Sequence, residues 1–357
     1  MAEEYRGKIA GGLPPLKARL VLHRDNQGWI LEKFAVRLAE NLGGFGVEAE
    51  ISDAPSASAD INHWMLYLYY DGSHLTRATA LITHIDQFSK LRLLKAAFDT
   101  LDAGICLSRM TVETLVRRGV KREKLCYVTP AHDGLARQKR IAIGITSRAY
   151  GDGRKREGML VELACAMRLD AFHFEIIGDG WERIIAALEA AGATVTYHRG
   201  SDDFEGDYAL TLERIAKFDY YLYTGLDEGS MGFLDALAAG VPTIVTPQGF
   251  HLDVEGGIFY PFTDVKDLIG VFITIAKERQ RRIDSVKGLT WATYARRHAQ
   301  VWQALAEGRS AASALESERP AATSRAIRFG GWEAAVEDAL FYAAPVVRRL
   351  KRLAKRR

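Results

Sequence analysis

The chain has 357 residues, of which 48% are apolar, and it carries a formal net charge of +3. This length and composition exclude a disordered chain and allow two ordinary globular domains. Its three cysteines lie far apart with no CxxC pair, which indicates neither a disulfide framework nor a thiolate metal site.

The positive charge belongs to the end of the chain. Residues 346–357 contain seven basic groups and no acid, so the rest of the chain carries −4 once those seven are subtracted from +3. A uniformly basic nucleic-acid-binding face is therefore not expected. The first residues include acids before any apolar run, and no stretch reaches the roughly 18 uncharged residues of a spanning helix. We expect a cytoplasmic protein.

Short apolar runs alternate with helix-period stretches through the first 135 residues. A helix is predicted over 29–42, because Ile30, Phe34, Leu38 and Leu42 repeat every four residues and form one apolar face. The candidate strands are 19–23, 47–51, 64–69, 79–83, 104–107 and 124–128. This alternation is typical of a parallel sheet with crossover helices.

A second series of the same kind follows residues 129–139, which combine Pro, Gly and charge and are predicted to connect two domains. Its candidate strands are 141–145, 172–177, 194–197, 219–223 and 243–245. The economical architecture is an α/β protein with two doubly wound, Rossmann-like domains, 1–135 and 136–292. A helical stretch ends near 307, residues 308–331 are small and polar like a linker, and 332–357 are predicted to form a basic helix.

Ligands of open α/β sheets bind beyond the carboxyl ends of the strands, so the loops there are candidate sites. The segment 224–242 runs from an apolar strand through an acidic, Gly-containing turn into a helix starting near Ser230. The helix N-terminus is a natural binding site for a phosphate group. Glu228 would face the group attached to that phosphate, and Asp235 could accept hydrogen bonds from a ribose diol. An acidic turn that only stabilises its own helix remains the alternative.

Three further loops carry candidate groups. The loop 146–158 offers Arg148, Arg154, Lys155 and Arg156 to a pyrophosphate, or is simply a solvated basic loop. The turn at Gly178 and Gly180 begins like a dinucleotide fingerprint but has Arg183 where a third glycine belongs, so a plain turn near a base or ribose is favoured. His84 follows a strand directly and could bind a sugar hydroxyl, or could be structural.

These residues together resemble the retaining glycosyltransferases of family 4, which have the GT-B fold. Members carry Glu-Gly-Phe-Gly after a strand, a second Glu eight residues after the first, and then Ala-Met-Ala-x-Gly-x-Pro. Here residues 227–235 read DEGSMGFLD and continue as ALAAGVP. The resemblance covers most of the second half and, more weakly, 104–133. It implies that the two domains face each other across a cleft and that the helix 293–307 crosses back to the first.

The resemblance also implies roles for individual residues. The first acid contacts the donor sugar; Glu228 is our choice, although Asp227 has the family spacing to Asp235 and remains the alternative. The second acid, Asp235, contacts the ribose, and the backbone of 229–232 contacts the diphosphate. These last residues are Gly229, Ser230, Met231 and Gly232.

Four more positions match the family. Arg148 and Lys155 resemble the family's Arg and Lys, which replace a metal in neutralising the leaving diphosphate, although the interval is longer here and Arg154 is an alternative to Lys155. His84 resembles the His that faces the reacting sugar, and Gly28 is the single glycine left of the usual pair before the first helix. The expected activity is therefore metal-independent, retaining transfer from a nucleoside diphosphate sugar to a saccharide or lipid-linked saccharide, without a cofactor.

Several alternatives remain at this point. The same fold could serve a nucleotide-sugar epimerase or hydrolase, or a partner subunit without catalysis, and the irregular acid spacing keeps the last of these open. The acidic cluster at Asp202, Asp203, Glu205 and Asp207 lacks metal-site spacing and is predicted to be a solvated loop. The basic tail could attach to the inner, anionic face of a membrane or pack on the first domain.

Overall fold

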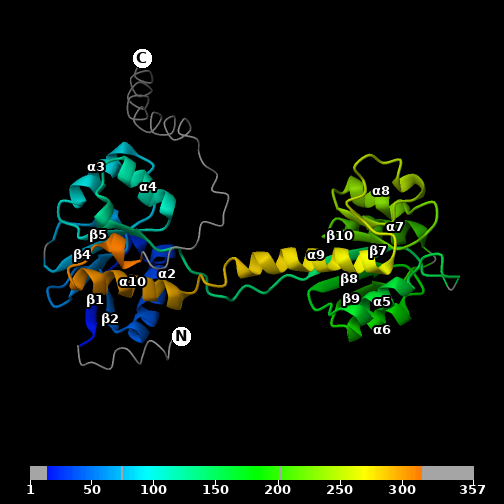
Figure 1. The fold of residues 1–357 in the computed structure, drawn as a ribbon, viewed down its shortest axis with the longest axis horizontal. Helices are drawn as coiled ribbons and strands as arrows, with labels where there is room; N and C mark the ends of the chain where they lie inside the picture. The colour runs from blue at the N-terminus through cyan, green and yellow to red at the C-terminus, as the bar shows by residue number, and fades with distance from the viewer. Residues whose placement is uncertain (1–13, 74, 151, 202, 316–357) are drawn as a thin grey trace, which may run out of the picture. The chain divides into compact units, whose positions relative to one another are not determined.

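The computed structural model describes residues 14–315, apart from residues 74, 151 and 202. The chain divides into two compact units, one formed by Met1–Leu135 with Lys287–Arg357 and the other by Ala136–Val286. In each unit the described residues form a six-stranded parallel sheet flanked by helices (Figure 1). The predicted α/β class, with two doubly wound units, is therefore confirmed.

The first unit contains a sheet in the order β2-β1-β3-β4-β5-β6. Its strands are β1 (Leu16–Val21), β2 (Val47–Ser52), β3 (Ile61–Trp64), β4 (Arg77–Ile82), β5 (Ala103–Cys106) and β6 (Leu125–Tyr127). Its helices are α2 (Ile30–Leu42), α3 (Phe88–Ala97), α4 (Arg109–Arg117), α10 (Trp291–Ala306) and α11 (Ala311–Ala314).

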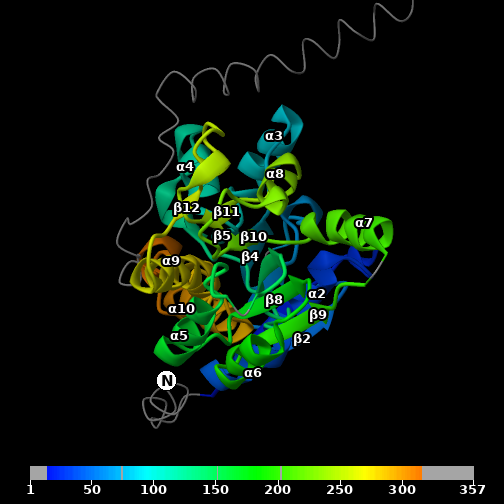
Figure 2. The same cartoon turned by 90° about the vertical axis from the view of Figure 1, so that its right-hand side faces the viewer.

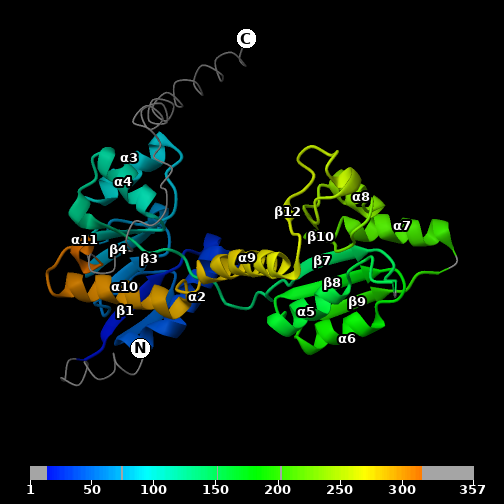
Figure 3. The ribbon, with the colours of Figure 1, turned by 45° about the vertical axis from the view of Figure 1, so that its right-hand side comes forward.

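Two apolar cores lie on the two faces of this sheet. On one face α2 and α10 pack together over β1 and β3, with Leu38 and Trp302 fully buried. On the other face α3 and α4 pack through Leu94 and Leu115 (Figure 3). Because both faces are covered, β3 and β5 are buried along their whole length, as is usual for strands inside a parallel sheet.

The second unit contains a sheet in the order β12-β11-β10-β7-β8-β9. Figure 2 labels β12, β11, β10, β8 and β9 of this sheet. Its strands are β7 (Ile141–Thr146), β8 (Phe172–Ile177), β9 (Thr194–His198), β10 (Tyr220–Tyr223), β11 (Thr243–Val245) and β12 (Tyr260–Pro261). Its helices are α5 (Gly158–Ala166), α6 (Glu182–Ala190), α7 (Phe204–Ile215), α8 (Met231–Ala238) and α9 (Val265–Asp284). The strand order reverses between β7 and β10, and ligands of such sheets bind beyond the carboxyl ends at that point.

Some predicted elements need correction. The strand expected at 64–69 ends at Trp64, because Tyr67–Tyr69 form a 3-10 helix instead. In α2 the buried face includes Leu31, whereas Ile30 at the helix start is 58% exposed. The four-residue repeat therefore identified the helix and misplaced one residue of its apolar face.

The described part of the acidic segment after β9 is largely solvent-exposed, as predicted, but it begins a helix rather than forming a loop; Asp202 lies outside the described residues. Asp203 is the N-cap of α7, where its carboxylate accepts a hydrogen bond from the Gly206 N–H, and Glu205 and Asp207 lie in the first turn. Acids at these positions stabilise a helix by capping it and by opposing its dipole. Within residues 14–315, less the three positions left out, no group of three His, Cys, Asp or Glu side chains is placed to hold a metal.

Residues 287–315 also differ from expectation. The second unit ends at Val286 rather than 292, because Trp291 packs in the core of the first unit. Residues 308–315, predicted as linker, include α11, with Ala311 and Leu315 buried against that core. The rest of the predicted linker and the helix predicted over 332–357 lie outside the described residues. No helix in the described part of the chain is both long and apolar enough to span a bilayer.

Two neutral histidines are buried in the first unit between β3 and α10. His63 and His298 are fully buried, with ring centroids 5.6 Å apart. The Nδ1 of His298 lies 2.9 Å from the Tyr294 carbonyl oxygen, and that of His63 lies 2.9 Å from the Thr79 hydroxyl. Burial lowers the pKa of His298 to about 4 and also holds the pKa of His63 well below its usual value.

The free energy of unfolding should therefore decrease as the pH falls below 6.5. Unfolded His298 takes up a proton near pH 6.5, whereas the folded imidazole stays neutral until about pH 4. The unfolded state then binds more protons, so stability rises with pH across this window, by about 2 kcal/mol between pH 5 and 6.5 for this one residue. Urea unfolding of the full chain at several pH values tests this. His298→Asn should reduce the pH dependence, and an unchanged slope would contradict the assignment.

Candidate functional site

Lys155 and Asp227 form an ion pair at the carboxyl edge of the second sheet. The Nζ of Lys155 lies 2.8 Å from Oδ2 of Asp227, and the two side chains are 16% and 29% exposed. The Tyr223 hydroxyl lies 2.5 Å from Nζ and 2.7 Å from Oδ1 of Asp227. Burial raises the pKa of the Asp227 carboxyl, but hydrogen bonds from Lys155, Tyr223 and the Gly229 N–H outweigh this and leave the pKa lowered. The carboxylate is thus ionised at neutral pH.

The two acids of the motif lie in different environments. Asp227 is half-buried and bound to Lys155, whereas the Glu228 side chain is exposed. The backbone of Glu228 is nevertheless fixed, because its carbonyl oxygen accepts a hydrogen bond of 3.1 Å from the Phe250 N–H. The Asp227 carboxylate is therefore already paired with a cation, whereas the Glu228 carboxylate is accessible to a ligand.

A buried histidine holds the turn that precedes α8. The N–H of Ser230, the N-cap residue, donates to Nε2 of His251 at 3.1 Å, and Nδ1 of His251 lies 3.2 Å from the Thr246 carbonyl oxygen. Both contacts suit a neutral imidazole protonated at Nδ1, and burial lowers the pKa of His251. The Ser230 amide is therefore used internally, whereas those of Met231 and Gly232 lie in the first helical turn, where no intrahelical carbonyl is available to them.

A pocket of roughly 490 Å³ lies beyond the carboxyl ends of β7 and β8 and is bounded by α7 and α8. Its wall includes Phe204 and Tyr208 of α7, whose rings are stacked with centroids 6.0 Å apart. Five residues predicted for the site line it: Arg148, Gly178, Met231, Gly232 and Asp235. Aromatic walls with a few polar groups and a helix N-terminus are typical of a small-molecule site.

Two of these lining residues are loosely held. Asp235 lies 3.4 Å from the Tyr208 hydroxyl, and Arg148 lies 3.6 Å from Asp179 with its side chain 58% exposed. Exposed pairs at such distances contribute little to stability. Both side chains are therefore able to exchange these contacts for those of a ligand.

Gly178 and Gly180 are required by the backbone itself. Both have positive φ values, 130° and 86°. A Cβ at Gly178 would lie 2.5 Å from the Ser147 carbonyl oxygen, and one at Gly180 would lie 2.6 Å from that of Ala149. These glycines let the turn after β8 pack on the loop after β7; only Gly178 also lines the pocket.

Gly178→Ala is expected to lower the free energy of unfolding by about 2–3 kcal/mol, since it adds backbone strain to a clash with a carbonyl group. Urea unfolding gives the value. Gly240→Ala is the matched control, because Gly240 also has a positive φ, 73°, but no atom lies within 4 Å of the position that its new methyl group would take. Equal losses for the two variants would show that neither the Ser147 contact nor the larger φ of Gly178 adds to the loss of stability.

The sequence did not reveal the role of Arg156, which we grouped with the cations of its loop. Its guanidinium donates to the Thr224 carbonyl at 2.8 Å, to the Thr263 carbonyl at 2.9 Å and to the Thr246 hydroxyl. Arg156 thereby joins the loops that follow β10, β11 and β12. Arg154, the alternative to Lys155, instead pairs with Asp152 at 3.2 Å and lies over the Tyr150 ring.

The remaining predicted site residues, His84 and Gly28, belong to the first unit. His84 follows β4, as expected, with its side chain 71% exposed and Nε2 3.9 Å from Oδ1 of Asp86. Gly28 has a φ of 76° and precedes α2, and its N–H donates to the Glu32 carboxylate. The Gly28 turn matches the expected glycine turn, and both residues lie at the carboxyl edge of the first sheet.

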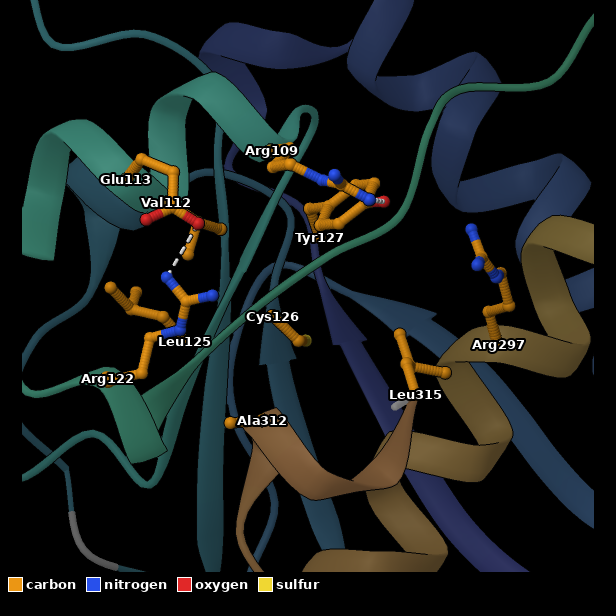
Figure 4. A pocket seen from close by; sticks show the side chains of 10 residues that line it. All are labelled: Arg109, Val112, Glu113, Arg122, Leu125, Cys126, Tyr127, Arg297, Ala312 and Leu315. Atoms are coloured by element: carbon orange, nitrogen blue, oxygen red, sulfur yellow. Dashed lines mark hydrogen bonds and ion pairs between the residues drawn. The ribbon is translucent and has the colours of Figure 1, made fainter. Parts of the chain in front are cut away.

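A second pocket lies along the edge strand β6 and contains none of the predicted residues. Arg122 pairs with Glu113 at 2.7 Å, and Arg109 donates to the Tyr127 hydroxyl at 3.2 Å. Figure 4 shows these two guanidinium groups directed toward their partners rather than toward each other. The arginines therefore do not converge on one position, as they would to bind an anion.

No family model matches the sequence, and no curated protein matches it. Among solved structures, the apo form of the lipopolysaccharide outer core galactosyltransferase WaaB is 13% identical and has a TM-score of 0.33, over 78% of this chain and 97% of that one. Anabaena Alr3699/HepE in complex with UDP-glucose is 13% identical with a TM-score of 0.31, over 82% and 99%. A putative UDP-N-acetylglucosamine 2-epimerase from Listeria monocytogenes is 10% identical with a TM-score of 0.30, over 82% and 97%. Likeness at this level identifies neither a family nor an activity.

Proposed function

We propose that the chain is a retaining glycosyltransferase of family 4 with the GT-B fold. It transfers a hexose from a nucleoside diphosphate sugar to a hydroxyl of a saccharide or lipid-linked saccharide, in the assembly of a surface polysaccharide or glycolipid. The observation that carries this proposal is the ion pair between Lys155 and Asp227. Asp227 lies in the loop that continues directly into the N-terminus of α8, and the first turn of α8 lines a pocket.

The donor is assigned to the second unit. The pocket wall at Phe204 and Tyr208 takes the planar base, and Asp235 accepts hydrogen bonds from the ribose. The diphosphate lies at the first turn of α8, where the amides of Met231 and Gly232 and the positive end of the helix dipole favour an anion. This assignment explains why the pocket joins aromatic rings, a carboxylate and a helix N-terminus.

Departure of the diphosphate is assisted by cations rather than by a metal. The Lys155 ammonium and the Arg148 guanidinium neutralise the charge that develops as the bond to the sugar breaks. Glu228 holds the sugar hydroxyls and His84 of the first unit lines the reaction site. The leaving phosphate takes the acceptor proton, so no side chain is assigned as a general base.

Binding of the donor tests this proposal directly. The full chain is screened by thermal shift and calorimetry against UDP-, GDP-, dTDP- and ADP-sugars, and the screen is repeated with Lys155→Ala and Glu228→Ala. Selective stabilisation by one nucleotide sugar that is lost in both variants supports the site. Absence of binding to every donor would exclude the transferase proposal.

The acceptor is proposed to be met at the inner face of the membrane. Residues 346–357 contain seven basic groups, and each adds about 1 kcal/mol of attraction near an anionic surface. Sedimentation of the full chain with anionic but not with zwitterionic vesicles is expected. Equal recovery with both kinds of vesicle would contradict an electrostatic attachment.

A further inference from the structure

We propose that Tyr223 is a positioning residue of the donor site, whose hydroxyl sets the relative positions of the Lys155 ammonium and the Asp227 carboxylate. This inference rests on the proposed function, because it assigns those two groups to the donor. The strand pattern YYLY identified Tyr223 only as a residue of an apolar strand, and only the structure shows which groups its hydroxyl contacts.

The Tyr223 hydroxyl lies where two loops of the proposed donor site meet. It is 2.5 Å from Nζ of Lys155, in the loop after β7, and 2.7 and 2.8 Å from the two carboxylate oxygens of Asp227, in the loop after β10. Gly225 makes room for it, since a Cβ there would lie 2.4 Å from the hydroxyl oxygen. The loop thus wraps closely around the end of one side chain.

The direction of each hydrogen bond follows from the charges. Tyr223 is 1% exposed, and burial, followed by the neighbouring Asp227, raises the pKa of its phenol, so the hydroxyl stays protonated. An ionised carboxylate only accepts and an ammonium only donates. The hydroxyl therefore donates to Asp227 and accepts from Lys155.

This arrangement orients Lys155. One of its three N–H groups points to Asp227 and another to the Tyr223 hydroxyl, so tetrahedral geometry fixes the direction of the third. An ammonium on a flexible four-carbon stem otherwise has no fixed orientation. Tyr223 thereby reduces the entropy that Lys155 would lose on meeting a diphosphate.

A matched control lies two residues earlier on the same strand. Tyr221 is also fully buried, but its hydroxyl contacts the Ser230 hydroxyl at 2.8 Å and the Thr146 hydroxyl at 3.3 Å. Tyr221→Phe and Tyr223→Phe each remove one buried phenol oxygen from β10. Only the second removes a hydrogen bond to Asp227.

The first test needs no ligand. The ¹³C resonance of the Asp227 carboxyl is followed through a pH titration in the full chain, with Asp227→Asn identifying the signal. Because the hydroxyl donates to the ionised carboxylate, Tyr223→Phe should move the titration midpoint to higher pH, whereas Tyr221→Phe should leave it in place. An unmoved midpoint in Tyr223→Phe overturns the positioning role and leaves the proposed function intact.

The second test measures transfer with the donor found by the nucleotide-sugar screen. Tyr223→Phe is expected to raise the donor Kd about tenfold and to move the acid limb of the kcat/KM profile upward with the Asp227 midpoint. Wild-type Kd and an unmoved limb overturn the positioning role. If the wild type binds no nucleotide sugar, the proposed function fails and so does the donor-site role, even where the midpoint has moved.

Discussion

Lys155→Met is expected to lower kcat/KM for sugar transfer by about 10²–10³, the usual loss when one preorganised charge is removed from a developing anion. The methionine keeps the length and apolar stem of the side chain and removes its charge. It also leaves the half-buried Asp227 carboxylate next to the departing diphosphate without its cation. The Asp227 carboxylate and the departing diphosphate then repel each other, which raises the free-energy barrier to transfer further.

The measurement is the initial rate of transfer over a range of donor concentrations. Arg154→Met is the matched control, since it removes a neighbouring cation that is already paired with Asp152 and stacked on Tyr150. Its effect should stay below about tenfold. A larger loss in Arg154→Met than in Lys155→Met would reverse the assignment of the family's lysine.

The fold could be predicted because its determinants are local. Runs such as 172–177 and 243–245 are rich in apolar and β-branched residues and lie between turn residues, and both strands have the predicted limits. The prediction failed where the alternation of apolar and polar residues did not by itself identify the element. The acids at 203–207 look like a loop until Asp203 is identified as a helix N-cap, and YLY at 67–69 has strand composition but 3-10 backbone.

The candidate site could be predicted only in part. Strand-end loops supplied Lys155 and Asp227, and the helix that follows one of them supplied Asp235, because topology alone brings such loops to one edge of a sheet. Tyr223 and His251 were missed because their roles depend on where a side chain ends after folding, at 2.5 Å from Lys155 and 3.1 Å from the Ser230 amide. No spacing rule connects residues 68 or 21 positions apart in the sequence.

Asp227→Asn and Glu228→Gln should separate the two acids by their effects on stability. Asp227→Asn leaves the Lys155 ammonium, only 16% exposed, without its carboxylate, and should lower the free energy of unfolding by about 1–2 kcal/mol, less than a fully buried pair would lose. Glu228→Gln changes an exposed side chain and should alter stability by less than about 0.5 kcal/mol. Urea unfolding of both variants gives these values.

Activity should follow a different order from stability. If Glu228 holds the donor sugar, Glu228→Gln lowers kcat/KM by about 10², because a carboxylate that binds hydroxyl groups in the transition state is replaced by a weaker acceptor. A Glu228→Gln enzyme with nearly wild-type kcat/KM, together with an inactive Asp227→Asn enzyme, would instead make Asp227 the first acid of the motif. The eight-residue spacing to Asp235 would then identify the first acid better than side-chain exposure does. The Asp227 carboxylate would in that case bind both Lys155 and the sugar.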